Sequence, residues 1–181
     1  MKRRKLQNLT LSALFLAIGY LLPFLTGQIR EIGNMLLPMH LPVLLCGLVC
    51  GPYYGLAVGA VLPLTRSLFF GMPLLYPSAI AMSFELAAYG VVIGFLQRRF
   101  VGRSVGRLYP ALLATMLAGR AVWGLATALL MGLGKRPYSF AAFFTGGVVK
   151  ALPGILLQLI LIPLLFAVLV RTKSIKLKKE P

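Results

Sequence analysis

The sequence predicts an all-α integral membrane protein, built as a compact bundle of six transmembrane helices. Hydrophobic residues make up 59% of the 181 residues and charged residues only 12%, whereas soluble proteins contain about 25% charged residues. The apolar residues form runs that approach the roughly 20 residues a helix needs to cross a bilayer. Lys and Arg residues gather between the runs, at alternate connections.

The apolar runs divide the chain into a single membrane domain, residues 1–181, with Pro and Gly marking most boundaries. We expect spans at residues 9–26, 40–51, 53–70, 79–97, 109–133 and 143–170. The second run is short for a full crossing, which predicts a tilted or partly re-entrant helix. The connections are short, so no ATPase or catalytic domain is expected outside the bilayer.

The basic residues predict the orientation of the chain in the membrane. A net charge of +16 would suggest a nucleic-acid partner for a soluble protein. Here the segments MKRRK, QRRFVGRSVGR and RTKSIKLKKE hold four, four and five of the nineteen Lys and Arg residues, while the outer connections hold Arg30, Lys135 and Arg136. This asymmetry predicts cytoplasmic termini in a cell membrane, with anionic lipid and not nucleic acid beside the basic clusters.

Small residues recur at four-residue spacing in the first three spans, as they do in helices that pack closely in lipid. In the first span Ala13 and Ala17 share a helix face with Ser12. The second and third spans continue the pattern with Gly47, Gly51, Gly55 and Gly59. We interpret the glycines as sites of tight helix packing.

Cys46 and Cys50 lie four residues apart on one predicted helix, without a neighbouring His or Asp. Two thiols alone make a poor metal site, and one helix cannot readily join them by a disulfide. We interpret both as small buried side chains and expect no metal site.

Four ionisable residues fall inside predicted spans, where a charge is costly and indicates a functional site. They are Arg66, Glu85, Arg120 and Lys150. With a rise of about 1.5 Å per residue, three of them lie roughly 6 to 10 Å below the outer ends of their spans, and Arg120 lies roughly 20 Å deep. This arrangement predicts a polar cavity open to the outside, with Arg120 near its floor.

One carboxylate cannot neutralise three cations, so we expect the cavity to carry excess positive charge and to suit a ligand with an anionic group. Glu85 is expected to pair with Arg66 or with Arg120 and to orient a second cation towards the ligand. The alternative is that Glu85 pairs with one cation while the others extend to the headgroups, which is easier for Arg66 than for the deeper Arg120.

Aromatic side chains accompany two of the charges. Tyr89 follows Glu85 by four residues and Trp123 follows Arg120 by three, so each aromatic residue shares a helix face with its charged neighbour. An aromatic wall with a few polar groups is typical of a small-molecule pocket. Gln158 is a further, deeper polar group on the helix of Lys150.

The first outer connection, GQIREIGNMLLPMH, is long for so small a protein. It contains Asn34 and the single histidine, His40, which we include as candidate ligand contacts. One histidine between Pro38 and Pro42 does not make a metal site. A connection of this length can cover a pocket as a lid.

These features resemble the S components of energy-coupling factor (ECF) transporters. The resemblance rests on the small-residue face in ALFLA, the long first outer connection and the stretches HLPVLLCGLVCGPYYGLAVGAVLPLTRSLFFGMP and AIAMSFELAAYGVVIGFL. It covers nearly the whole chain and is most characteristic over residues 38–94.

The resemblance implies a substrate-specificity subunit that binds a water-soluble vitamin or related micronutrient near the outer face. It also implies that Ala13 and Ala17 contact a transmembrane T component, which two ATPase subunits drive, and that the subunit topples to carry its pocket inward. ATP and Mg²⁺ would be used by those partners. This chain has no G-x-x-x-x-G-K-[ST] phosphate loop, so we expect no cofactor in it.

The ligand and two other function classes stay open at this point. Excess positive charge favours an anionic vitamin such as pantothenate, followed by niacin or lipoate, while pyridoxine or a hydroxymethylpyrimidine precursor fits if Glu85 neutralises the cations. A small membrane enzyme acting on phosphorylated lipid would need clustered Asp or His residues, which the chain lacks. A packing subunit without a ligand would leave Arg120 unexplained.

Overall fold

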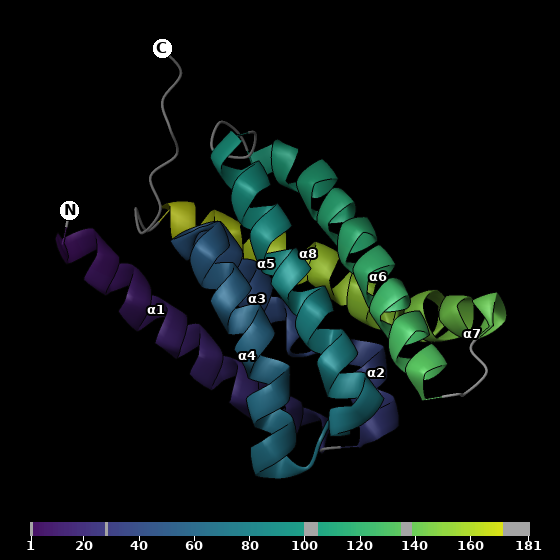
Figure 1. The fold of residues 1–181 in the computed structure, drawn as a ribbon. Coiled ribbons are helices and arrows are strands. Elements are labelled where there is room, and N and C mark those ends of the chain that lie inside the picture. Colours follow the sequence, from purple (N-terminus) through teal and green to yellow (C-terminus); the bar gives the residue numbers. More distant parts are fainter. Residues whose placement is uncertain (1, 28, 100–104, 135–138, 172–181) are drawn as a thin grey trace.

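The computed structural model describes residues 2–27, 29–99, 105–134 and 139–171, and these ranges form a helical bundle without strands (Figure 1). The predicted all-α fold is therefore confirmed over the described ranges. Five helical stretches within them are long and apolar enough to cross a membrane: Arg3–Leu25, Pro52–Phe70, Leu75–Arg99, Leu108–Leu133 and Thr145–Arg171. The remaining predicted span, 40–51, corresponds to a shorter apolar helix, His40–Cys50.

The first half of the chain contains four helices. Helix α1 (Lys2–Leu21) continues into a 3-10 turn (Leu22–Thr26), and a short helix, α2 (Arg30–Leu36), follows. Helices α3 (His40–Cys50) and α4 (Pro52–Phe70) are separated by Gly51, whose φ of 99° reverses the chain between them. The region predicted as the first outer connection thus carries a helix of its own.

The second half contains three long segments. A distorted helical turn (Leu75–Ala79) leads into α5 (Ile80–Arg99), and α6 (Leu108–Leu133) runs back beside it (Figure 1). The last predicted span is interrupted: α7 (Phe140–Phe144) and a π-helical turn (Thr145–Val149) precede α8 (Leu152–Arg171).

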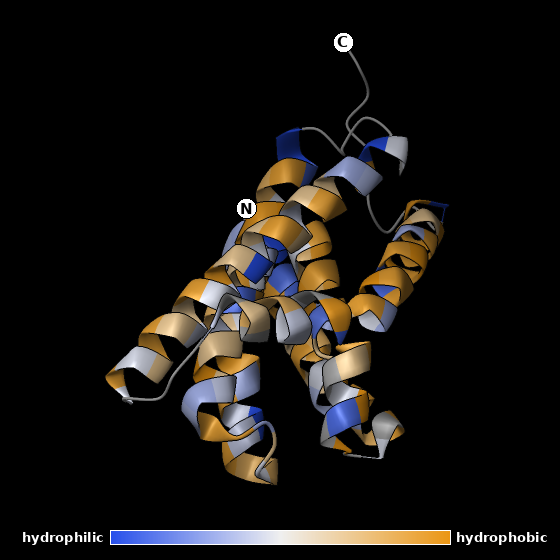
Figure 2. Ribbon diagram, turned by 90° about the vertical axis from the view of Figure 1, so that its right-hand side faces the viewer, coloured by the Kyte–Doolittle hydropathy of each residue, from blue (hydrophilic) through white to orange (hydrophobic). Residues whose placement is uncertain are grey.

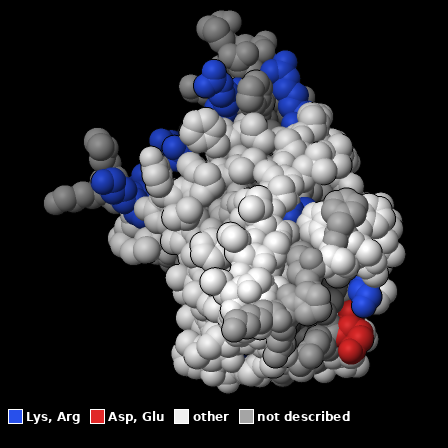
Figure 3. All heavy atoms as spheres, turned by 45° about the vertical axis from the view of Figure 1, so that its right-hand side comes forward, with Lys and Arg blue, Asp and Glu red and all other residues white. Residues whose placement is uncertain are grey.

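The two ends of the bundle differ in charge. Near the start of α1, the Asn8 amide donates a hydrogen bond to the Cys50 carbonyl, and the Arg98 guanidinium lies against Gly51. The start of α1 and the ends of α3 and α5 therefore share one end of the bundle. Figure 3 shows most of the visible Lys and Arg at this end and an acidic patch, with basic atoms beside it, towards the opposite end, and Figure 2 shows largely hydrophobic helices between them.

Three helices approach closely through the predicted glycine repeat. A Cβ atom added to Gly47 of α3 or Gly55 of α4 would lie 2.7 Å from the Gly90 carbonyl oxygen of α5, and one at Gly59 would overlap the Leu86 backbone. A side chain at any of these positions would push the helices apart. The interpretation of these three glycines as packing sites is confirmed.

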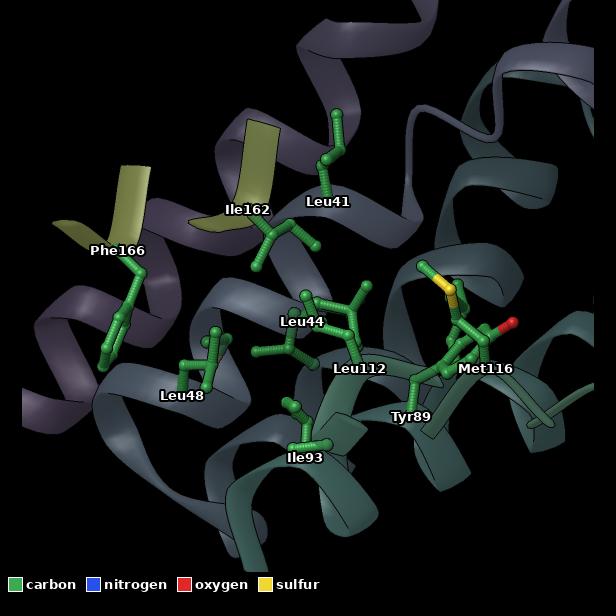
Figure 4. Close-up of a cluster of buried hydrophobic side chains, with 14 of the residues drawn as sticks. Leu41, Leu44, Leu48, Tyr89, Ile93, Leu112, Met116, Ile162 and Phe166 are labelled. Carbon is green, nitrogen blue, oxygen red and sulfur yellow. The ribbon is translucent and has the colours of Figure 1, made fainter. Parts of the chain in front are cut away.

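The apolar core lies around α3, which packs mainly against α5, α1 and α4, and side chains of α6 and α8 complete the cluster (Figure 4). Leu44 and Leu48 of α3 are fully buried or nearly so, together with Ile93, Leu112 and Ile162. Because α3 is surrounded by other helices, its short apolar run needs no lipid-facing side. The prediction of two small buried cysteines is also confirmed, since Cys46 and Cys50 are both buried and free.

Helix α2 packs against the first turn of α8. A Cβ atom added to Gly154 would lie 2.5 Å from the Met35 carbonyl oxygen and 2.9 Å from that of Leu36. The end of α2 therefore rests directly on the α8 backbone, and Gly154 permits this approach. The connection between α1 and α3 therefore packs on α8 at the end of the bundle opposite the basic end.

Candidate ligand-binding site

Glu85 forms the centre of a buried polar cluster between α3, α5 and α6. Its Oε1 atom lies 3.0 Å from Arg120 Nη1 and 3.4 Å from His40 Nε2. Glu85 and His40 are each 1% exposed and Arg120 is 9% exposed. Of the two partners that the sequence left open for Glu85, the structure brings it to Arg120. The pairing compensates part of the cost of burying each charge.

Tyr89 joins this cluster from the same face of α5 as Glu85. Its ring packs edge-on against the His40 ring, with 5.1 Å between the ring centres. Gly119 of α6 makes room for it, since a Cβ atom there would lie 2.7 Å from the Tyr89 ring. Figure 4 shows Tyr89 beside Met116, another α6 residue. Tyr89 therefore holds His40 and α6 in place around Glu85.

Arg120 retains hydrogen-bonding capacity beyond its contact with Glu85. Its Nε and Nη2 atoms are buried and have no hydrogen-bond partner among the described residues. The guanidinium carbon lies 6.0 Å from the centre of the Trp123 ring, which is half-buried and packs against Phe143. Nε and Nη2 present parallel N–H groups along one edge, the arrangement that binds a carboxylate through two hydrogen bonds.

Other buried polar atoms are also left without a hydrogen-bond partner in the described part of the chain. These are Nδ1 of His40, the side-chain nitrogen of Gln158 and the hydroxyl of Thr127, while His40 Nε2 and Glu85 Oε1 face each other at 3.4 Å without forming a hydrogen bond. Buried polar groups are almost always hydrogen-bonded in folded proteins. Such groups are candidates for contacts with another molecule. The sequence named Gln158 as a further polar group and did not single out Thr127.

Arg66 lies apart from Glu85. Its side chain is 2% exposed, its Nη1 donates a hydrogen bond of 2.7 Å to the Tyr20 carbonyl, and its guanidinium packs beside the rings of Phe24 and Phe70, which contact each other edge-on. Arg66 is therefore buried in the protein and does not extend to the headgroups. Phe70, four residues after Arg66, was a signal for this arrangement in the sequence, whereas Phe24 comes from another element.

Two further predicted residues are not placed in the Glu85 cluster. The Lys150 side chain is exposed, next to the interruption between the π-helical turn and α8. Asn34 lies within α2, but its side chain is outside the described part of the structure. The sequence predicted that all four intramembrane charges converge. Glu85 and Arg120 do so, whereas Arg66 and Lys150 lie elsewhere.

The two alanines predicted as a partner interface lie on the outside of α1. Ala13 and Ala17 are both exposed, while Ser12 between α1 and α3 is buried and receives a weak hydrogen bond from the Cys46 thiol. Exposed leucines such as Leu6, Leu14 and Leu21 accompany the alanines on α1. This side of α1 is free of other described helices.

A family model for the substrate-specific component of ECF transporters matches residues 7–166. The chain belongs to this family. Searches among curated proteins and among solved structures found no match.

Membership of the ECF substrate-specific components makes this chain a substrate-specific subunit of a transporter. The family resemblance stated from the sequence is confirmed over residues 7–166. Family membership also implies association with a T component and with ATPases. The apolar helices agree with a multi-pass membrane protein.

Proposed function

We propose that this ECF substrate-specific component captures a water-soluble vitamin or vitamin precursor with an anionic group, pantothenate being the best candidate. The ligand is taken up at the outer half of the bundle, from the side of α2. ATP and Mg²⁺ are used by the two ATPase subunits of the module, and this chain has no cofactor of its own. The chain acts in the cell membrane of a prokaryote, with both termini cytoplasmic.

The free edge of Arg120 carries this proposal. Glu85 engages Nη1 alone, so Nε and Nη2 remain available to a ligand. Two parallel N–H groups match the two oxygens of a carboxylate, and a buried charge-assisted pair of this kind is among the strongest polar contacts in proteins. Trp123 beside the guanidinium offers an aromatic wall for the rest of the ligand.

The remaining unpaired groups favour a ligand with several polar atoms. The Gln158 amide nitrogen and the His40 ring nitrogens can bond hydroxyl or amide groups. Pantothenate combines one carboxylate with hydroxyl and amide groups, whereas niacin has fewer such groups and lipoate is mostly apolar. This match favours pantothenate among the anionic candidates.

A neutral ligand is the second candidate, because Glu85 already balances the charge of Arg120. Pyridoxine and the hydroxymethylpyrimidine precursor offer hydroxyl and ring-nitrogen acceptors to the same edge. They differ from pantothenate in having no carboxylate, so a matched pair of ligands separates the two candidates.

The test is a thermal-shift titration of the purified chain in an uncharged detergent, without ATP. Pantothenate is compared with pantothenol, in which a primary alcohol replaces the carboxylate, and nicotinate with nicotinamide. We expect pantothenate to raise the unfolding temperature and pantothenol to leave it unchanged. Stabilisation by pyridoxine or hydroxymethylpyrimidine alone would favour the neutral candidate. No stabilisation by any vitamin or precursor would contradict the proposed capture of a vitamin.

A further inference from the structure

A cavity of about 100 Å³ lies in the outer half of the protein, apart from the Glu85–Arg120 pair. It is bounded by the turn after α1, by α2, by the outer end of α4 and by the connection that follows α4. Arg66 and His40 line it, whereas Glu85 and Arg120 do not. His40 thus stands between the cavity and the cluster described above, because its Nε2 atom contacts Glu85.

Arg66 is a buried cation without an acidic partner among the described residues. Glu85 pairs elsewhere, and no ion pair joins Arg66 to Glu31, the other described carboxylate. The guanidinium carries five N–H groups, and the Tyr20 carbonyl accepts from Nη1. A buried charge is strongly disfavoured without a counter-charge. The cavity wall at Arg66 therefore attracts an anion.

Two aromatic rings hold the guanidinium at the cavity wall. Its central carbon lies 5.2 Å from the centre of the Phe24 ring and 5.1 Å from that of Phe70. Cation–π contacts at this distance orient the planar fork without neutralising its charge. Arg66 is thus positioned to form charge-assisted hydrogen bonds with an added acceptor.

The other walls of the cavity are mostly apolar. Ile29, Leu37, Met72, Leu74 and Met82 contribute, with Ser78 as a small polar group. The volume is well below the roughly 300 to 1,000 Å³ of sites that enclose a whole drug-sized ligand, so the cavity fits a head group. Phe24 and Phe70 are each 41% exposed, and Leu68 and Phe69 next to them are 70% and 74% exposed. An apolar chain attached to the head group would therefore continue over a surface that faces lipid.

We propose that the Arg66 cavity is a second binding site, which takes the anionic head group of an amphiphile. Arg66 binds a carboxylate or phosphate oxygen, and the apolar walls and the surface of α1 and α4 contact the attached chain. A free fatty carboxylate and an anionic phospholipid share this chemistry. This site is distinct from the vitamin site because a different arginine binds the anion, although His40 and α5 border both sites.

The test uses the full-length chain in an uncharged maltoside detergent, with native mass spectrometry and thermal shift as readouts. Decanoate is compared with decanol, and dihexanoyl phosphatidylglycerol with dihexanoylglycerol, which lacks the phosphate. We expect each anionic probe that binds to do so at least tenfold more tightly than its neutral partner. Binding of decanoate alone identifies a free carboxylate as the source, and binding of phosphatidylglycerol alone identifies a phospholipid. Equal binding within both pairs would overturn the proposal.

Variants locate the bound probe. Arg66→Gln should weaken binding at least tenfold and Arg66→Lys by less, while Arg99→Gln, at an exposed arginine of the basic end, should change nothing. If Arg66→Gln does not fold, Met82→Trp fills the cavity with Arg66 intact and should exclude the probe, with Met131→Trp on α6 as its control. Unchanged binding in a folded Arg66→Gln or Met82→Trp protein would overturn the site.

A final variant separates this site from the vitamin site. Arg120→Gln should leave binding of the anionic amphiphile unchanged, since Arg120 does not line the cavity. Loss of amphiphile binding in Arg120→Gln, with binding retained in Arg66→Gln, would place the amphiphile at Arg120 and overturn the second site.

Discussion

Arg120 of α6 meets Glu85 of α5 with 3.0 Å between Nη1 and Oε1, and both residues are buried. The contact joins two neighbouring helices at the depth where the sequence predicted a ligand site. It leaves the other edge of the guanidinium unpaired. The contact through Nη1 therefore contributes to stability, which can be measured without a ligand. The edge formed by Nε and Nη2 is the part of Arg120 that a ligand can contact.

The contact between Glu85 and Arg120 predicts that substitutions at the two residues have strongly coupled effects on the free energy of unfolding. Glu85→Gln and Arg120→Gln should each destabilise the protein by about 3 kcal/mol, because each leaves a buried charge uncompensated. The double variant should lose clearly less than the sum, since no charge is left unpaired. Chemical or thermal unfolding in one detergent measures this. Glu31→Gln, at an exposed carboxylate, is the control and should change stability by less than about 0.5 kcal/mol. Additive losses would mean that the two side chains do not interact.

The free edge of the Arg120 guanidinium predicts that lysine cannot replace Arg120 in binding the vitamin. Arg120→Lys keeps the charge but removes the paired N–H groups of the free edge. Loss of one charge-assisted hydrogen bond, worth about 1.5 to 3 kcal/mol, should weaken binding of the anionic vitamin by about 10- to 100-fold. Equilibrium binding of the radiolabelled vitamin measures this, with Arg99→Lys as the control. Wild-type affinity in Arg120→Lys would remove the bidentate contact from the proposal.

The glycine contacts predict a position-specific stability effect. Gly55→Ala places a Cβ atom 2.7 Å from the Gly90 carbonyl oxygen and 2.9 Å from the Gly47 Cα, so α3, α4 and α5 must separate. We expect a loss of about 1 to 3 kcal/mol. Gly132→Ala has nothing within 4 Å of the new atom and should be neutral or slightly stabilising, because alanine favours the helix. Unfolding midpoints that do not differ between the two variants would contradict the close packing.

The sequence was sufficient to predict these glycines and the buried ionisable residues, because both signals are local. Four-residue glycine spacing forms one strip on a helix, and a charge within an apolar run stands out by itself. The partner of Glu85 was not predictable in the same way. Depth along a helix was estimated from residue position, but the rotation of each helix about its axis was not, and rotation turns Arg66 towards Tyr20 and Phe24 instead of Glu85.

Lys150 and Gly154 illustrate a second limit of the sequence. Residues 143–170 read as one continuous apolar span, yet a π-helical turn ends at Val149 and the Lys150 side chain is exposed. Gly146, Gly147 and Pro153 were the available signals for an interruption. Gly154 supports the end of α2, and the two segments are more than 100 residues apart in the sequence. No local sequence pattern encodes such a contact.

The contact between α2 and α8 predicts a role for Gly154 in ligand retention. Gly154→Ala would bring a Cβ atom within 2.5 Å of the Met35 carbonyl oxygen and lift α2 away from α8. If α2 covers the vitamin site, the ligand should dissociate several-fold faster, because an open lid lowers the barrier to release. A filter-binding chase experiment measures the rate, with Gly132→Ala as the control. An unaltered dissociation rate in a folded Gly154→Ala protein would show that α2 does not retain the ligand.

The exposed small-residue face of α1 predicts a separation of binding from transport. Ala13→Trp and Ala17→Trp add bulk to a surface that contacts no described helix, so vitamin binding by the isolated chain should stay within about twofold of wild type. Close packing against the T component tolerates no such bulk, and uptake by the assembled transporter should fall at least tenfold. Ala114→Trp, at an exposed alanine of α6 on the other side of the bundle (Figure 1), is the matched control for bulk in the membrane. Equal uptake by the α1 variants and the α6 control would move the T-component interface away from Ala13 and Ala17.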